Sequence, residues 1–309
     1  METETAASVY LAPQGFEQDL IEELERNGHT IVFRRDRLIG TDKAAFIPVW
    51  AENVWLEPQF LPASSIGEGV RGLKSLQRNW ALYSTLEHRR AALIQEGLPM
   101  TGKRPFIFGS EVPAAPMGGW TLWSRDSILA SARCSSPFAN GAVSFAEDKT
   151  GPPNRAYLKL WEAFTRLGKR PSAGELCLDL GSSPGGCTWV LAGLGARVFS
   201  IDKAPLAGHI ARHPLVEHCR GSAFGLEPQI AGNVDWLFCD VACYPDRLLS
   251  LVHRWLEYNP SCKMLCTIKF SGKTDFPVLE EFLRIPGSFA MHLHVNKHEV
   301  TWGCIKEHC

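Results

Sequence analysis

Four charged residues in the second half of the chain have the types and order of a proton-transfer site. They are Lys159 in an amphipathic segment, Asp240 at the end of VDWLFCD, Lys269 at the end of CTIK, and Glu299 at the start of the last apolar run. A lysine amine can accept a hydroxyl proton once its pKa falls from about 10.4, and carboxylates can orient that amine. Burial and a second ammonium lower such a pKa, whereas carboxylates raise it. Taken singly, a charged residue at the end of a strand or helix is more often solvated than catalytic.

A glycine-rich turn lies between an apolar strand and a helix. Its sequence, DLGSSPGG from Asp179 to Gly186, differs from the G-x-G-x-x-G spacing of dinucleotide sites, and Pro184 removes a backbone donor. About 20 residues later, Asp202 ends the next predicted strand, where a carboxylate commonly binds ribose hydroxyls. The two features together indicate a nucleoside cofactor. The alternative is a glycine turn beside a solvated aspartate.

From residue 155 onward, apolar strands alternate with amphipathic helices. Helices are predicted at 157–168, 185–195, 245–258 and 275–285, and strands at 175–181, 197–202, 216–221, 234–241 and 261–270. A hairpin of strands 288–295 and 299–306 follows, and His292 and His294 are expected on a solvated face of it. This order predicts an α/β fold, a doubly wound Rossmann-like sheet with an antiparallel terminal hairpin.

The first half of the chain is predicted to form a smaller α+β domain. It opens with a strand at 9–13, a helix from Phe16 to Leu24 that ends before Gly28, and a strand at 29–33. A helix at 78–97 and strands at 104–110 and 119–126 follow. Residues 134–155 are predicted to be a connecting arm, and Pro152-Pro153 marks the boundary. The expected domains are therefore 1–151 and 152–309.

The composition excludes several classes of protein. With 45% apolar residues the chain can bury real cores, and 32 basic against 33 acidic residues exclude polyanion binding through bulk charge. Local basic groups remain as RNA-binding candidates: Arg34, Arg35, Arg37, His88, Arg89, Arg90, Lys103 and Arg104. No signal peptide and no apolar run of about 18 residues is present. We therefore expect a cytoplasmic protein with reduced cysteines, no metal and no membrane partner. The sequence does not indicate the oligomeric state.

The turn resembles motif I of S-adenosylmethionine-dependent methyltransferases, in the Pro-Gly-Gly version of the FtsJ-like RNA methyltransferases. The order Lys159, Asp240, Lys269, Glu299 resembles the catalytic tetrad of the ribose 2′-O-methyltransferases in that group. Longer segments are similar to RlmM-type enzymes, which methylate a cytidine of bacterial 23S rRNA. These segments include PPNRAYLKLWEAF, WLFCDVACYPDRL and LHVNKHEVTWGCIK, and in the first half APQGFEQDLIEEL and SSPFANGAVSF.

This resemblance implies a ribose 2′-O-methyltransferase that uses S-adenosylmethionine as cofactor. Its substrate would be structured RNA, with 23S rRNA as the main candidate. Lys269 would accept the hydroxyl proton, and Asp240 and Glu299 would orient the Lys269 amine. Lys159 would steady the hydroxyl or a nearby phosphate. By motif position, the cofactor-binding residues are Ala156, Asp179, Gly181, Ser183, Pro184, Gly185, Gly186, Asp202, Ser222 and Asp240. The family tends to have an acidic residue where Ser222 stands. Its RNA-binding half is also longer, so an abbreviated THUMP-like module is expected here.

Two other functions fit parts of the pattern. A small-molecule methyltransferase would use the first half as a lid over its substrate, although such O-methyltransferases often use a metal or a histidine base. A non-catalytic RNA-binding or assembly factor could keep the same fold. The presence of all four charged residues disfavours such a loss of catalysis.

Overall fold

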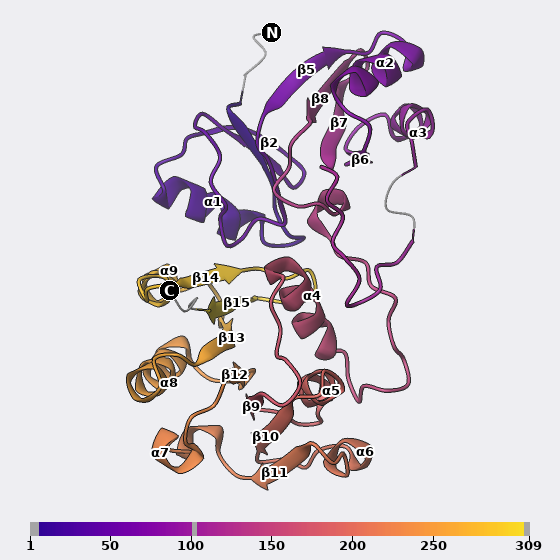
Figure 1. The fold of residues 1–309 in the computed structure, drawn as a ribbon. Coiled ribbons are helices and arrows are strands. Elements are labelled where there is room, and N and C mark those ends of the chain that lie inside the picture. Colours follow the sequence, from indigo (N-terminus) through magenta and orange to yellow (C-terminus); the bar gives the residue numbers. More distant parts are fainter. Residues whose placement is uncertain (1–5, 101–103, 306–309) are drawn as a thin grey trace. The chain divides into compact units, whose positions relative to one another are not determined.

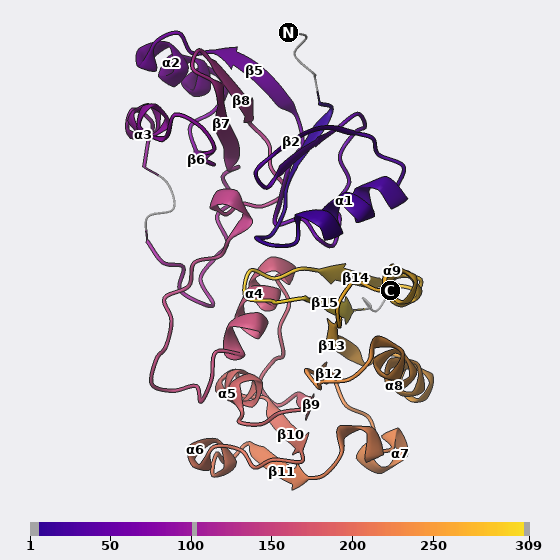
Figure 2. The ribbon, with the colours of Figure 1, turned by 180° about the vertical axis from the view of Figure 1, so that it is seen from behind.

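The chain separates into two compact units in the computed structural model, which describes residues 6–100 and 104–305. The units are Met1–Ala146 and Glu147–Cys309, and Figures 1 and 2 show their elements from opposite sides. No helix within the described ranges is long and apolar enough to cross a membrane.

The second unit is built on a seven-stranded sheet in the order β11-β10-β9-β12-β13-β15-β14. The strands from β9 to β13 run parallel, and β15 and β14 join them antiparallel. Their bounds are β9 Leu176–Leu180, β10 Arg197–Asp202, β11 Val216–Arg220, β12 Trp236–Cys239, β13 Lys263–Lys269, β14 Ser288–Met291 and β15 Glu299–Cys304. The predicted doubly wound α/β sheet with an antiparallel terminal hairpin is confirmed.

Helices cover both faces of this sheet. On one side lie α4 (Tyr157–Leu167), α5 (Gly186–Gly193) and α6 (Gly208–Ala211), and on the other α7 (Pro228–Ala231), α8 (Pro245–Tyr258) and α9 (Phe276–Leu283) (Figures 1 and 2). Because helices shield both faces, the central strands can be apolar along their whole length. All four residues of β12, WLFC, are buried. The apolar runs in the sequence are thus the interior of this unit.

The strand order reverses between β9 and β12. From β9 the chain adds β10 and β11 on one side, then returns to place β12 on the other side of β9. In doubly wound sheets, ligands bind outside the carboxyl ends of the strands at such a reversal. The glycine turn follows β9, and Asp240 follows β12. Both predicted features therefore lie at the edge where a ligand is expected.

The first unit contains two four-stranded sheets, β2-β3-β1-β4 and β5-β8-β7-β6. Its elements are β1 Ser8–Leu11, α1 Glu17–Arg26, β2 Ile31–Arg35, β3 Leu38–Thr41, β4 Asn53–Trp55, β5 Pro58–Pro62, α2 Ile66–Leu76, β6 Trp80–Leu82, α3 His88–Glu96, β7 Gly118–Ser124, β8 Ser127–Ser131 and a 3₁₀ turn, Ala139–Gly141. One apolar cluster around Leu11, Trp55 and Leu129 draws on both sheets. The predicted strand–helix–strand opening is confirmed, with Gly28 at a φ of 75° after α1.

Two expectations for the first unit are wrong. Residues 78–97 are not one helix, because β6 pairs in parallel with β7 and α3 begins only at His88. Trp80 is buried and its indole N–H donates to the carbonyls of Leu73 and Gln77, so tertiary packing outweighs the helical pattern. The strand expected at 104–110 is reduced to one bridge, from Phe106 to Phe145. Lys103 lies outside the described residues.

The connection between β14 and β15 also differs from the prediction. β14 ends at Met291, so His292 and His294 lie in the connection and not on a strand face. His294 is exposed, but His292 is buried, with Nε2 3.1 Å from the carbonyl oxygen of Lys297. The expectation that both histidines lie on a solvated sheet face is wrong, because the connection folds back on itself.

A buried carboxylate ties this connection to helix α4. Glu162 is 1% exposed, and both its oxygens accept the backbone N–H of His294 at 3.0 Å. Its Oε1 also lies 2.6 Å from Nη2 of Arg166, one helical turn further on. Helix α4 thereby fixes the position of the 292–298 connection.

Removing this carboxylate should destabilise the second unit. In Glu162→Ala, the N–H of His294 and the guanidinium of Arg166 lose their shared partner, and we expect the free energy of unfolding to fall by about 3 kcal/mol. Urea denaturation of the full chain measures this. Glu257→Ala, at an exposed position of α8, is the matched control and should change it by less than about 0.5 kcal/mol. Equal effects of the two substitutions would contradict the anchoring role.

Candidate active site

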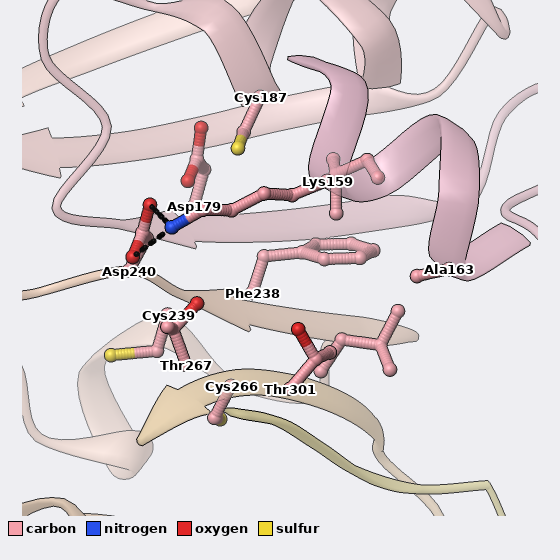
Figure 3. A pocket seen from close by; sticks show the side chains of 12 residues that line it. Lys159, Ala163, Asp179, Cys187, Phe238, Cys239, Asp240, Cys266, Thr267 and Thr301 are labelled. Carbon is pink, nitrogen blue, oxygen red and sulfur yellow. Dashed lines mark hydrogen bonds and ion pairs between the residues drawn. The ribbon is translucent and has the colours of Figure 1, made fainter. Parts of the chain in front are cut away.

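The four charged residues predicted from the sequence meet at the carboxyl edge of the sheet. Nζ of Lys159 lies 2.7 Å from Oε1 of Glu299 and 3.1 Å from Oδ2 of Asp240 (Figure 3 shows the Lys159–Asp240 pair). Nζ of Lys269 lies 2.8 Å from Oδ1 of Asp240 and donates to the backbone carbonyl of the same residue at 2.7 Å. Lys269 and Glu299 are directly opposed in the β13–β15 ladder. The structure therefore joins all four into one ion network.

The two lysines of this network are not equivalent. Lys159 contacts two carboxylates, whereas Lys269, among the residues described, contacts that of Asp240. Burial would lower the pKa of Lys159, but attraction to Asp240 and Glu299 outweighs it and raises this pKa above its ordinary value. Burial would raise the pKa of Asp240, but the two lysines hold it below its ordinary value. At neutral pH, Lys159 is thus a fixed cation and Asp240 a fixed anion.

The turn between β9 and α5 requires its glycines. Gly181 and Gly185 have φ values of 81° and 116°, which L side chains rarely adopt. A Cβ on Gly186 would lie 2.0 Å from Oδ1 of Asn154. The same Oδ1 accepts the N–H of Ala156 at 3.2 Å, just before α4. The segment that leads into α4 therefore packs directly on the turn, which brings Ala156 beside the predicted cofactor site.

Asp202 holds the turn from the end of β10. Its Oδ2 accepts the N–H of Ser183 at 3.0 Å, and its Oδ1 accepts the N–H of Ala204 at 2.8 Å. Two carboxylate oxygens offer about four acceptor positions, so hydroxyl donors can still bind. Ser222 follows the adjacent strand β11 at the same edge and is exposed. Both residues are placed where a ribose and a base could lie side by side.

Asp179 is buried within this site and does not face the solvent. It is 2% exposed, and its Oδ2 accepts the hydroxyl of Thr188 at 2.6 Å. Burial raises the pKa of Asp179 to about 7, and the negative charges of Asp240 and Asp202 also raise it. With Lys159 and Asp240, Asp179 lines a cavity of about 20 Å³, enough for one water molecule (Figure 3).

The polar groups of the turn fit a nucleoside cofactor that has an amino-acid end. Asp202 has carboxylate oxygens of the kind that accept hydroxyl hydrogen bonds, and the turn opens helix α5. Oγ of Ser182 is buried and, in the described part of the chain, has no hydrogen-bond partner. The carbonyl of Pro184 already accepts the N–H of Ala207 at 2.9 Å, which fixes the turn's shape. The residues present therefore suit S-adenosylmethionine.

Sequence reasoning missed several residues that build the site. Asn154 packs on Gly186, Thr188 holds Asp179, and Glu162 anchors the 292–298 connection. Two of these stand in a loop and in a short apolar helix, where nothing in the sequence marks them. The third follows Lys159 by three positions, which places the pair on one side of α4. That spacing is the signal that could have found Glu162.

The second unit is thus a doubly wound, Rossmann-like α/β domain with an ion network at its ligand-binding edge. Residues 152–284 match the family of FtsJ-like methyltransferases. The resemblance that the sequence predicted is confirmed over this segment, which carries Lys159, Asp240 and Lys269, while Glu299 lies beyond it.

Curated relatives share the description "Ribosomal RNA large subunit methyltransferase M". The chain is 36% identical to that of Halorhodospira halophila over 157 residues, 48% of this chain and 46% of the relative. It is 40% identical to that of Thauera aminoaromatica over 165 residues, 48% and 45% of the two chains. The match to that of Marinomonas sp. is 27% identical over 270 residues, 81% and 71% of the two chains. The chain thus spans about half the length of the first two relatives.

The buried acid predicts a pH-dependent stability. The pKa of Asp179 rises from 3.8 to about 7 on folding, so the stability gained by the neutral acid is present at low pH and is lost as pH rises between those values. Relative to wild type, Asp179→Asn should therefore gain on the order of 4 kcal/mol of unfolding free energy across that window. Urea denaturation at several pH values measures the difference. Asp246→Asn, at an exposed position, is the control. If the stability difference between Asp179→Asn and wild type varies with pH no more than that between Asp246→Asn and wild type, the burial effect is contradicted.

Proposed function

We propose that the chain transfers the methyl group of S-adenosylmethionine to a ribose 2′-hydroxyl of RNA, and that the RNA is 23S rRNA with a cytidine as target. The observation that carries this proposal is the carboxylate of Asp240, shared between Lys159 and Lys269 at the sheet's ligand-binding edge. The descriptions of the relatives support an RNA of the large ribosomal subunit as substrate. Such a substrate implies a cytoplasmic location.

Lys269 acts as the proton acceptor. A 2′-hydroxyl is a weak nucleophile at neutral pH and loses its proton as its oxygen bonds to the methyl carbon. In the neutral form that a proton acceptor requires, the lysine amine has two N–H groups and one lone pair. The contacts of Lys269 with Oδ1 and the backbone carbonyl of Asp240 can occupy both N–H groups. The lone pair then remains for the hydroxyl proton.

Lys159 keeps its own proton during this step. Its contacts with Asp240 and Glu299 raise its pKa, which makes it a poor base but a stable positive charge. Such a charge can steady the hydroxyl oxygen as it loses its proton. Glu299 is opposite Lys269 in the ladder, but its carboxylate pairs with Lys159 at 2.7 Å and so holds that cation. Most of the rate then comes from the alignment of the hydroxyl with the methyl group.

The turn residues hold the cofactor. When bound, S-adenosylmethionine would supply a methyl group on a sulfonium, which needs no metal for its transfer. Asp202 would accept hydrogen bonds from the ribose hydroxyls, and Ser222 would lie beside the adenine. Ala156, Gly181 and Ser183 would stand at the amino-acid end, together with Pro184, Gly185, Gly186 and the buried Asp179.

The first unit captures the RNA. Three of its predicted basic residues hold the fold instead. Arg35 stacks 3.6 Å from the ring of Trp123, Arg37 pairs with Glu52 at 2.8 Å, and Nη2 of the half-buried Arg90 donates to the carbonyl of Ala63 at 2.6 Å. The exposed basic residues, Arg34, His88, Arg89 and Arg104, are the ones available to phosphates.

Methyl transfer to RNA is testable with the purified full chain. We expect label from S-adenosylmethionine to enter 23S rRNA taken from cells that lack the gene, and nuclease digestion with mass spectrometry to find it in 2′-O-methylcytidine. Rejection of every RNA, or label on a base, would contradict the proposal. NAD is the control ligand in calorimetry, and tight binding of NAD without binding of S-adenosylmethionine would exclude the cofactor.

The role of Lys269 is separable from cofactor binding. Lys269→Ala and Lys269→Arg should both lower kcat by at least about 100-fold, since a guanidinium stays protonated, while the Kd for cofactor stays within about twofold. Lys263→Arg, at the other end of β13, is the matched control and should stay active. Substantial turnover by Lys269→Arg would exclude a proton-acceptor role.

A further inference from the structure

A groove lies next to the ion network, within the second unit. Its volume is about 530 Å³, which is the size of a site for a nucleotide-sized ligand. One wall is formed by Arg155 and Ala156, just before α4, and by Lys159 of that helix. The other is the connection from β14 to β15, with His294 and Lys297, and the first residue of β15, Glu299. Lys159 and Glu299 belong to both the groove and the ion network, so a ligand in the groove lies beside that network.

The groove carries two outward cations. Within it, Glu299 is paired with Lys159 at 2.7 Å, so these two charges offset each other. Arg155 has a side chain 73% exposed; one of its nitrogens pairs with Glu147 at 2.8 Å, and a guanidinium has further N–H donors. Lys297 is exposed as well. With both of these ion pairs offset, Lys297 supplies the excess positive charge of the groove, and Arg155 supplies spare N–H donors.

The wall that carries Lys297 is held in place before any ligand binds. Glu162 accepts the N–H of His294, and Nε2 of His292 lies 3.1 Å from the carbonyl oxygen of Lys297. Asn296 is buried and its N–H donates to the carbonyl of Leu293 at 2.9 Å. A preformed wall loses less conformational entropy on binding, which favours a binding surface over a solvated loop.

We propose that this groove binds the phosphodiester chain of the RNA next to the reacting ribose, with Arg155 and Lys297 as its phosphate contacts. This inference rests on the proposed function. In RNA the carbon that bears the 2′-hydroxyl is bonded to the carbon that bears the 3′-phosphate. A hydroxyl delivered to Lys269 therefore brings a phosphate to within a few ångströms of the network, and the groove is the cationic space there. Both side chains act in binding and in holding the nucleotide in place, and neither takes the proton.

The test compares Arg155→Ala, Lys297→Ala and the double variant with Arg197→Ala, whose exposed side chain lies at the opposite, amino end of β10. Each groove substitution should raise the KM for RNA about two- to fivefold, the range of an exposed ion pair, and should leave the Kd for S-adenosylmethionine within about twofold. The slope of log affinity against log salt should become shallower by roughly 0.7–0.9 for each lost contact. The Arg197 control should change none of these.

Two results would overturn the groove assignment. One is an unchanged RNA affinity and salt slope in the double variant. The other is a loss of cofactor affinity without a change for RNA, which would assign the cations to the carboxylate of the cofactor. Fluorescence anisotropy with labelled RNA separates this inference from the proposed function. A wild-type chain that binds RNA but transfers no methyl group refutes the function. The RNA affinities of the groove variants then still test whether the groove binds RNA. A wild-type chain that binds no RNA refutes both.

Discussion

The carboxylate of Asp240, shared between two lysines, is the interaction on which the rest of the site depends. A charge withdrawn from water is costly unless paired, and here Lys269 contacts Oδ1 of Asp240 at 2.8 Å while Lys159 contacts Oδ2 at 3.1 Å and Oδ1 at 3.3 Å. Because Lys159 also binds Glu299, the sharing is unequal. The two lysine side chains therefore differ although their chemistry is the same: Lys159 contacts two carboxylates and stays a cation, whereas Lys269 contacts one.

Residues far apart in the chain build this arrangement, and the sheet fixes their distances. Asp240 follows β12 and Lys269 ends the neighbouring parallel strand β13, and the β13–β15 register sets Glu299 opposite Lys269. Lys159 arrives from a helix, whose position is fixed by contacts at its start and by Glu162 further along. The same helix forms one wall of the cationic groove. The ion network and the groove are thus linked through α4.

Much of this was predictable from the sequence, because buried parallel strands appear as continuous apolar runs and the site residues stand at their ends. The strands that end at Asp202, Asp240 and Lys269 follow that rule. Prediction failed where a long-range contact decides the outcome: Trp80 joins a sheet despite a helical pattern, and His292 turns inward in a connection. Lys297 lies in the same connection, where no periodicity marks it. Which carboxylate each lysine would contact depends on side-chain distances, which only the folded chain defines.

The unequal sharing of charge is best tested by an NMR titration of the lysine side chains in the intact protein, with Lys159→Arg used to assign the resonance of Lys159. Two carboxylates around one ammonium predict that Lys159 titrates above about 10.4, the ordinary pKa of lysine, and that Glu299→Gln lowers this pKa. A Lys159 that titrates at or below the ordinary value, or that does not respond to Glu299→Gln, would contradict the assignment of Lys159 as the fixed cation of the site.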